Sequence, residues 1–133
     1  MINPLDTVLA IYSAFGTGDV PTILSHLDSD VSWDEGIRST NVPYLQPGRG
    51  IEHAATFFGA VHDHFEVTQF ELGTPAVGGN EVLVRVRISG RNRTTGREIP
   101  LVPEVHHWVL DHSGKVIAFN HIGDWAVHEA ASA

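Results

Sequence analysis

Histidine is the residue type in this sequence that offers the most chemistry, since nine of the 133 residues are His. Imidazole titrates near neutral pH and is the commonest metal ligand in proteins. His62 and His64 flank an aspartate, and His106 and His107 are adjacent. Residues two apart on a helix diverge by about 200°, and adjacent strand residues face opposite sides, so neither pair is expected to share a metal ion. Four other histidines have no evident partner and are expected at the surface: His26, His53, His112 and His128.

The other reactive residue types narrow the function class. There is no cysteine, which excludes disulfides, thiolate nucleophiles and Cys-based metal sites. Sixteen acidic residues against eight basic ones give a formal net charge of −8, so we expect no nucleic-acid partner. The first 16 residues have no basic region and no small-residue cleavage site, which favours the cytoplasm over secretion, and no membrane association is expected. Five of the eight basic residues lie in one stretch: Arg85, Arg87, Arg91, Arg93 and Arg97.

The length and a mean hydropathy of −0.02 predict one globular domain over residues 1–133. Asn3 followed by a proline predicts the start of a helix, and Gly16 is expected to end it in a left-handed conformation. Asp19 should cap a second, shorter helix. The two segments predict a helical hairpin.

Over residues 30–35 apolar and polar residues alternate, in place of the helical spacing before them. This alternation predicts a short strand with Glu35 at its end. Residues 36–50 are rich in Pro and Gly and should form an irregular connection, a candidate lid or pocket rim. A third helix is expected from Ile51 to about His64, with Phe58 on its apolar face.

The chain after Phe65 has strand character, interrupted by turn signals at residues 77–80, 93–96 and 111–114. Four antiparallel strands in a meander are therefore expected. Helices followed by strands predict an α+β domain, in which three N-terminal helices pack on one face of a curved, mainly antiparallel sheet.

The alternation of apolar and polar residues shows which side chains of one strand face the core, but it does not settle this for two other strands. Val82, Val84, Val86 and Ile88 should face the core, which sends Arg85 and its neighbours outward. In residues 104–110 and 116–123 hydrophobicity does not choose between the two faces.

Five strings resemble the nuclear transport factor 2-like superfamily, specifically its SnoaL-like and ketosteroid-isomerase-like branch. They are Gly18-Asp19, the run from Asp30 to Glu35, Gly48 to Ile51 before Phe57-Phe58, Thr95 to Arg97, and Gly114 to Val116 leading to Gly123 to Trp125. The resemblance implies a cystatin-like cone with an internal apolar cavity. It also implies a homodimer that pairs through the outer sheet face.

The resemblance also implies a catalytic site. The general base of ketosteroid isomerases matches Glu35, the acidic partner falls on His106, and the oxyanion-donating tyrosine falls on Ile11, next to Tyr12. In SnoaL-like aldol cyclases the acid/base residue lies near the end of the last strand, where His121 and Asp124 stand.

A limonene epoxide hydrolase mechanism is not expected, because its Asp-Arg-Asp positions read Ile88, Val86 and His121. The expected catalytic residues are thus Glu35, His106, His121 and Asp124, although Asp124 also suits a helix cap. The expected substrate-binding residues are Trp33, Trp108, Tyr12, Phe58, Val86, Ile88 and Phe119. No cofactor and no metal are expected; a mononuclear metal site of His106, His121 and Glu35 is the remaining alternative.

The leading hypothesis is an enzyme that moves a proton on a small apolar carbonyl compound, as an isomerase or a cyclase does, with Glu35 as the base. A non-catalytic module for a hydrophobic ligand and a dimeric interaction domain with a filled core are the alternatives. A cavity of less than about 100 Å³ would argue against both ligand hypotheses, because ordinary ligand pockets are several-fold larger.

Overall fold

The computed structural model describes residues 3–133, which form four helices and a seven-stranded mixed sheet. The helices are α1 (Pro4–Gly16), α2 (Val20–Ser25), α3 (Ile51–His64) and α4 (Trp125–Ser132). The strands are β1 (Leu27–Trp33), β2 (Gly48–Arg49), β3 (Phe65–Leu72), β4 (Ala76–Gly78), β5 (Glu81–Asn92), β6 (Glu98–Leu110) and β7 (Val116–Gly123). Within the described part of the chain, no helix is long and apolar enough to cross a membrane.

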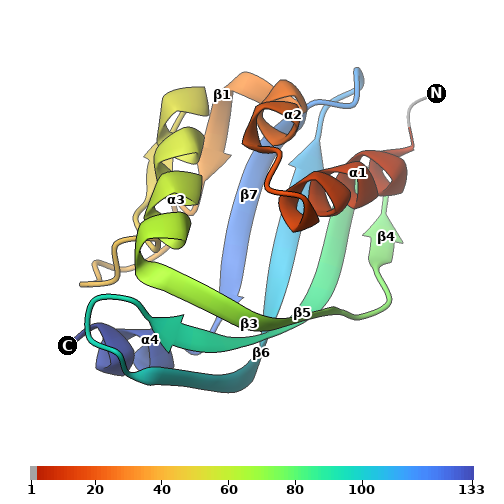
Figure 1. The fold of residues 1–133 in the computed structure, drawn as a ribbon. Helices are drawn as coiled ribbons and strands as arrows, with labels where there is room; N and C mark the ends of the chain where they lie inside the picture. Colours follow the sequence, from red (N-terminus) through yellow and green to blue (C-terminus); the bar gives the residue numbers. More distant parts are fainter. Residues whose placement is uncertain (1–2) are drawn as a thin grey trace.

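The sheet runs in the order β2-β1-β7-β6-β5-β3, with β4 paired to β5. All pairings are antiparallel except that of β1 with β7. Figure 1 shows α1, α2 and α3 on one side of the curved sheet and α4 at the end where β5 and β6 bend. The α+β fold expected from the sequence is confirmed, with a fourth helix and a parallel strand pair that the expectation lacked.

The two predicted caps of the N-terminal helices are confirmed. The Asn3 side chain accepts a hydrogen bond from the Leu5 amide, and the Asp19 side chain accepts one from the Thr22 amide. The expected left-handed residue lies elsewhere, because α1 includes Gly16 and the positive φ of 71° belongs to Gly18. Thr17 and Gly18 form a turn between α1 and α2, in which the Gly18 amide donates to the Phe15 carbonyl.

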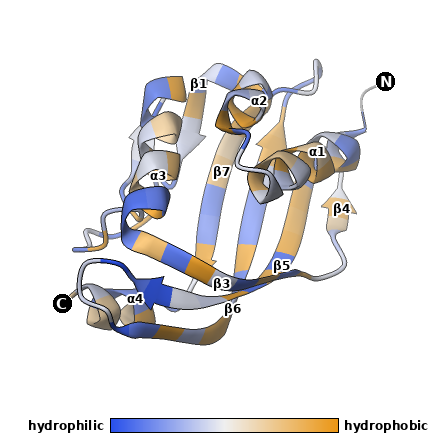
Figure 2. Ribbon diagram, in the orientation of Figure 1, coloured by the Kyte–Doolittle hydropathy of each residue, from blue (hydrophilic) through white to orange (hydrophobic). Residues whose placement is uncertain are grey.

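The core fills the space between the helices and the inner face of the sheet. Val82, Val84, Val86 and Ile88 are buried, as alternation predicts, while Arg85 lies on the exposed outer face. Figure 2 shows the corresponding change between hydrophilic and hydrophobic segments along the strands.

The strand pairing of β3 and β5 is irregular near Gly90. The register shifts between Val67 and Gln69 on β3 and between Ile88 and Gly90 on β5. A Cβ atom at Gly90 would overlap the backbone carbonyl of Glu66, so the close approach of the strands requires glycine. Such irregularities bend a sheet locally, and here they curl it around the helices.

Candidate functional site

An apolar cavity lies between α1, α3 and the inner sheet face. Six large aromatic side chains make up much of its wall: Trp33, Phe57, Phe58, Phe70, Trp108 and Phe119. The cavity is partly open to solvent and has a volume of about 70 Å³. This volume falls below about 100 Å³, which argues against both ligand hypotheses for the cavity in this conformation, so a substrate or ligand requires the cavity to widen.

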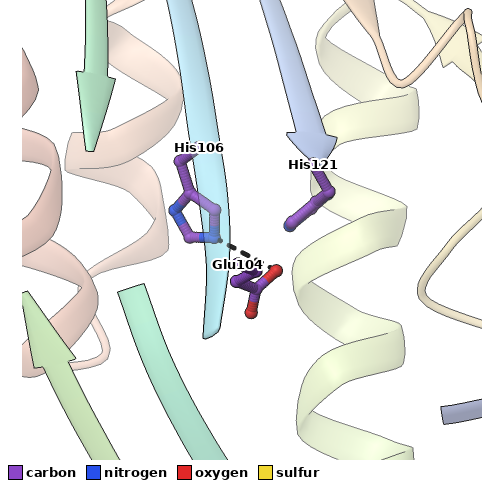
Figure 3. A group of neighbouring side chains, drawn as sticks. All are labelled: Glu104, His106 and His121. Atoms are coloured by element: carbon purple, nitrogen blue, oxygen red, sulfur yellow. Dashed lines mark ion pairs between the residues drawn. The ribbon is translucent and has the colours of Figure 1, made fainter. Parts of the chain in front are cut away.

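Two adjacent strands carry the polar groups of the cavity. His106 on β6 is the direct cross-strand partner of His121 on β7, and their ring centroids lie 5.0 Å apart. Glu104 precedes His106 by two residues and therefore points to the same face of the sheet. One ligand atom from each of the three residues lies within 4.8 Å of the others. Figure 3 shows the Glu104 carboxylate between the two imidazoles, joined by a dashed line to His106.

Asp34 fixes His121 in place. Its fully buried carboxylate accepts one hydrogen bond from the His121 backbone N–H and one from the His121 Nδ1, each 2.7 Å long. Asp34 has a φ of 54°, in the left-handed region that aspartate tolerates better than most residues. Its backbone N–H donates to the Phe119 carbonyl, so the end of β1 is attached to β7 at three points.

Tyr12 holds the second imidazole from α1. The Tyr12 hydroxyl is hydrogen-bonded to His106 Nδ1 at 2.7 Å and accepts a hydrogen bond from Trp108 Nε1 at 3.1 Å. Both imidazoles of the cluster are therefore held through Nδ1. The Nε2 atom of His106 lies 3.6 Å from the Glu104 carboxylate.

A second tyrosine–histidine pair completes the polar part of the cavity. The Tyr44 hydroxyl, from the connection between β1 and β2, is hydrogen-bonded to His128 Nδ1 of α4 at 2.7 Å. His128 is 3% exposed and lines the cavity, so its expected surface position is wrong. His128 lies on α4, a helix that was not predicted, and the pairing of β6 with β7 does not determine where this helix packs.

Burial and neighbouring charges set the ionisation of the cluster. Burial favours a raised pKa for Glu104, but contact with His106 and the charges of His121 and His128 hold this pKa below its usual value. Burial opposes a charge on His121, yet the Asp34 hydrogen bond and the charges of Asp34 and Glu104 raise its pKa. The surroundings thus favour the charged forms of both Glu104 and His121.

The remaining groups of the cluster are neutral. Burial lowers the pKa of His106, and the nearby charge of His121 lowers it further against the opposing effect of Glu104. Burial also raises the pKa of the Tyr12 phenol, which leaves it a neutral hydrogen-bonding group. Burial lowers the pKa of His128 in the same way.

The structure does not place Glu35 in the cavity, where the sequence comparison expected it. Because Asp34 takes the left-handed conformation, the alternation of β1 stops at Trp33, Asp34 turns inward and Glu35 turns out. The Glu35 side chain is 41% exposed and forms an ion pair of 2.8 Å with Arg49. The position beside His106 and His121 that the family resemblance implies for Glu35 is therefore wrong.

The other expected site residues divide into three groups. Asp124 is exposed and caps α4, where its side chain accepts a hydrogen bond from the Ala126 amide. Tyr12 and Val86 are buried but do not line the cavity. The residues that do line it are His106, His121, Trp33, Trp108, Phe58, Ile88 and Phe119.

Two carboxylates of the site, Asp34 and Glu104, were not predicted from the sequence. Glu104 had a usable signal, because it shares the alternation of His106 and Trp108. Asp34 had none, because alternation places it on the face opposite Trp33. Glu104, rather than Glu35, completes a set of one carboxylate and two imidazoles suited to a divalent metal ion.

Comparison with known proteins agrees with this architecture. The family model of the SnoaL-like domain matches residues 8–119. No curated protein matches the sequence. The fold is similar to that of a nuclear transport factor 2-like protein from Burkholderia thailandensis, with 22% identity and a TM-score of 0.85 over 100% of this chain and 99% of that chain.

Two further structures share the fold. A nuclear transport factor 2-like protein of unknown function from Burkholderia pseudomallei has 24% identity and a TM-score of 0.79 over 98% of each chain. TerC, co-crystallised with polyporic acid, has 21% identity and a TM-score of 0.75 over 97% of each chain. With its helices on one face of a curved sheet around an aromatic cavity, and with a family match over most of its length, this chain belongs to the SnoaL-like domain family.

Proposed function

We propose that this protein is an enzyme that moves a proton on a small apolar carbonyl compound, as an isomerase or a cyclase does. The observation that carries the proposal is the placement of Glu104, His106 and His121 within 4.8 Å of one another in an aromatic cavity. Buried ionisable groups are costly to maintain, and such clusters gather at functional sites. A provisionally named polyketide cyclase from Pseudomonas putida shares the fold at 18% identity, with a TM-score of 0.72 over 100% of each chain.

Each residue of the cluster has a role in the proposed reaction. The Glu104 carboxylate takes the proton from the carbon next to the carbonyl group, the role that the family resemblance implies for Glu35. His106 and His121 donate hydrogen bonds to the oxygen on which negative charge develops. Asp34 is a positioning residue, because it holds the His121 ring through Nδ1.

The size of the cavity limits the substrate. About 70 Å³ admits only a few heavy atoms, so a larger compound has to displace side chains of the wall. Phe57, Phe58 and Phe70 are only half-buried, which makes them the part of the wall best able to move. The co-crystallisation of TerC, which shares the fold, with polyporic acid supports the proposal of a small-molecule substrate.

The small cavity also favours a second candidate function, a non-catalytic interaction module whose core is nearly filled. In that case the homodimer expected from the family resemblance would be the functional unit. Leu83 and Ile122, on the outer sheet face, are 43% and 53% exposed and would support such pairing. Sedimentation of the purified protein measures the dimer directly. The cytoplasmic location stays a prediction.

Deuterium exchange tests the proposed reaction without knowledge of the natural substrate. A panel of small ketones and β-diketones in D₂O is followed by NMR for loss of the proton next to the carbonyl group. Wild-type protein should accelerate the exchange, and Glu104→Gln should slow it by about 100-fold or more. Glu35→Gln is the matched control and should stay within about twofold, because an exposed ion pair contributes little.

Two results would change the assignment. Exchange that survives in Glu104→Gln but disappears in Glu35→Gln would return the role of the base to Glu35. A wild-type protein that neither binds nor exchanges any member of the panel would favour the interaction module.

A further inference from the structure

We propose that Glu104, His106 and His121 form a binding site for one borderline divalent cation such as Zn²⁺. The proposal concerns the same cavity as the proposed function, but it rests on ligand geometry and charge and holds for a protein with or without a substrate. A bound cation would supply Lewis-acid polarisation of a carbonyl oxygen. Because Glu104 and the two imidazoles would then be ligands, the metal-bound state and the proton-transfer state described above would exclude each other.

The three ligands come from rigid, paired strands. Glu104 and His106 lie two residues apart on β6, and His121 is paired with His106 across the β6–β7 ladder. One ligand atom of each residue lies within 4.8 Å of the others, and Figure 3 shows the three side chains converging on one space. Bonds of about 2.0–2.2 Å place ligand atoms roughly 3.4 Å apart, so small side-chain rotations close the site.

The outer partners of both imidazoles are already in place. Metal-bound histidines donate their other ring N–H to a carboxylate or another acceptor, which fixes the ring and its tautomer. Asp34 occupies this position behind His121, and the Tyr12 hydroxyl occupies it behind His106. The Tyr12 oxygen has two lone pairs, so it can accept from His106 while it still accepts from Trp108. Because Nδ1 of each ring is hydrogen-bonded in this way, the Nε2 atoms of His106 and His121 are available to bind the cation.

Charge compensation gives an independent argument. The cluster contains two buried carboxyl groups, those of Asp34 and Glu104. Among the described residues, neither lysine nor arginine lines the cavity. A divalent cation would balance both carboxylates and leave the two imidazoles neutral, which is the state in which they ligate.

The volume and the ligand types indicate the kind of cation. A cavity of about 70 Å³ accommodates a cation with one or two water molecules, since a water occupies about 30 Å³ in the liquid. Three protein ligands and an open position are the arrangement of catalytic zinc sites. Two imidazoles disfavour Mg²⁺ and Ca²⁺, which prefer oxygen ligands.

Calorimetric titration of the chelator-treated protein with ZnCl₂, in the absence of any substrate, tests the proposal. Wild type should bind one equivalent with a Kd of about 1 µM or tighter. Glu104→Gln and His121→Asn should each weaken binding by at least about 100-fold, and Asp34→Asn by about 10- to 100-fold. His107→Asn is the matched control, because His107 is the chain neighbour of His106 on the opposite face, and its affinity should not change.

A measurement on the unaltered protein covers the case in which the variants fail to fold. Co²⁺ added to wild type should produce visible absorption bands of a low-coordinate site and two shifted imidazole N–H signals in the NMR spectrum. The absence of one-equivalent binding by folded wild type would overturn the proposal, as would affinity that persists in His121→Asn. Because no substrate is present, this result is independent of the deuterium-exchange result.

Discussion

Neighbouring residues on β6 place the same chemistry on opposite faces of the sheet. His106 faces the cavity and lies 3.6 Å from Glu104, with side chains that are 9% and 8% exposed. His107 faces outward and lies 2.7 Å from Glu81, with side chains that are 24% and 53% exposed. Each pair joins an imidazole to a carboxylate, yet only the inner pair lies among aromatic side chains.

The outer pair has the shorter contact, but we expect the inner pair to contribute more to the free energy of unfolding. Water and salt screen the outer pair, so its contribution to the free energy of unfolding should be small. The inner groups have lost their hydration, so removal of one partner leaves another buried without compensation. Burial thus makes each group of the inner pair depend on its partner for charge compensation, which is not so for the exposed pair.

The largest expected effect on stability is that of His121→Ala on the inner face. It removes the side-chain partner of Asp34, which is fully buried, and should lower the free energy of unfolding by about 3–5 kcal/mol. His107→Ala on the outer face should cost less than about 1 kcal/mol. Urea unfolding followed by tryptophan fluorescence measures both. Equal losses would show that the two faces do not differ as proposed.

A smaller loss in the free energy of unfolding is expected when a tyrosine hydroxyl that is hydrogen-bonded to a buried imidazole is removed. Tyr12→Phe leaves both His106 Nδ1 and Trp108 Nε1 without this partner and should cost about 2–3 kcal/mol. Tyr44→Phe leaves only His128 Nδ1 and should cost about 1–2 kcal/mol. Thermal unfolding of the two variants at the same pH compares them. A greater loss in Tyr44→Phe would contradict the central place given to Tyr12.

The smallest effect belongs to the outer carboxylate. Glu81→Gln keeps the size of the side chain but removes the charge that faces His107, and it should change the free energy of unfolding by less than about 0.5 kcal/mol. Any difference from wild type should vanish in high salt, as measured by urea unfolding with and without NaCl. A loss that high salt leaves intact would mean that the outer pair is also shielded from water.

Local signals predicted most of the elements. The caps at Asn3 and Asp19 depend on side-chain hydrogen bonds to amides two or three residues away, so the sequence contains all the information they need. The alternation from Val82 to Ile88 is equally local. In contrast, α4 begins just after a strand, and its only local signal is the N-cap at Asp124. The helix itself was therefore not predicted.

The site was predicted in part. His106 and His121 were chosen through a family resemblance, and their cross-strand pairing explains why they meet. Glu104 was present in the same alternating set but was not assigned to the site. Glu35 was assigned through the same resemblance, but the left-handed conformation of Asp34 ends the alternation of β1 and turns Glu35 outward.

By itself the sequence determined the fold class, the caps, the core face of β5 and the absence of cysteine chemistry, because each depends on composition or on neighbours within a few residues. Only the tertiary structure decided which carboxylate faces the imidazoles. The left-handed turn at Asp34 is held by His121 and Phe119, which lie more than 80 residues away in the chain. These contacts across the chain reverse the faces of Asp34 and Glu35, and no local pattern in the sequence records them.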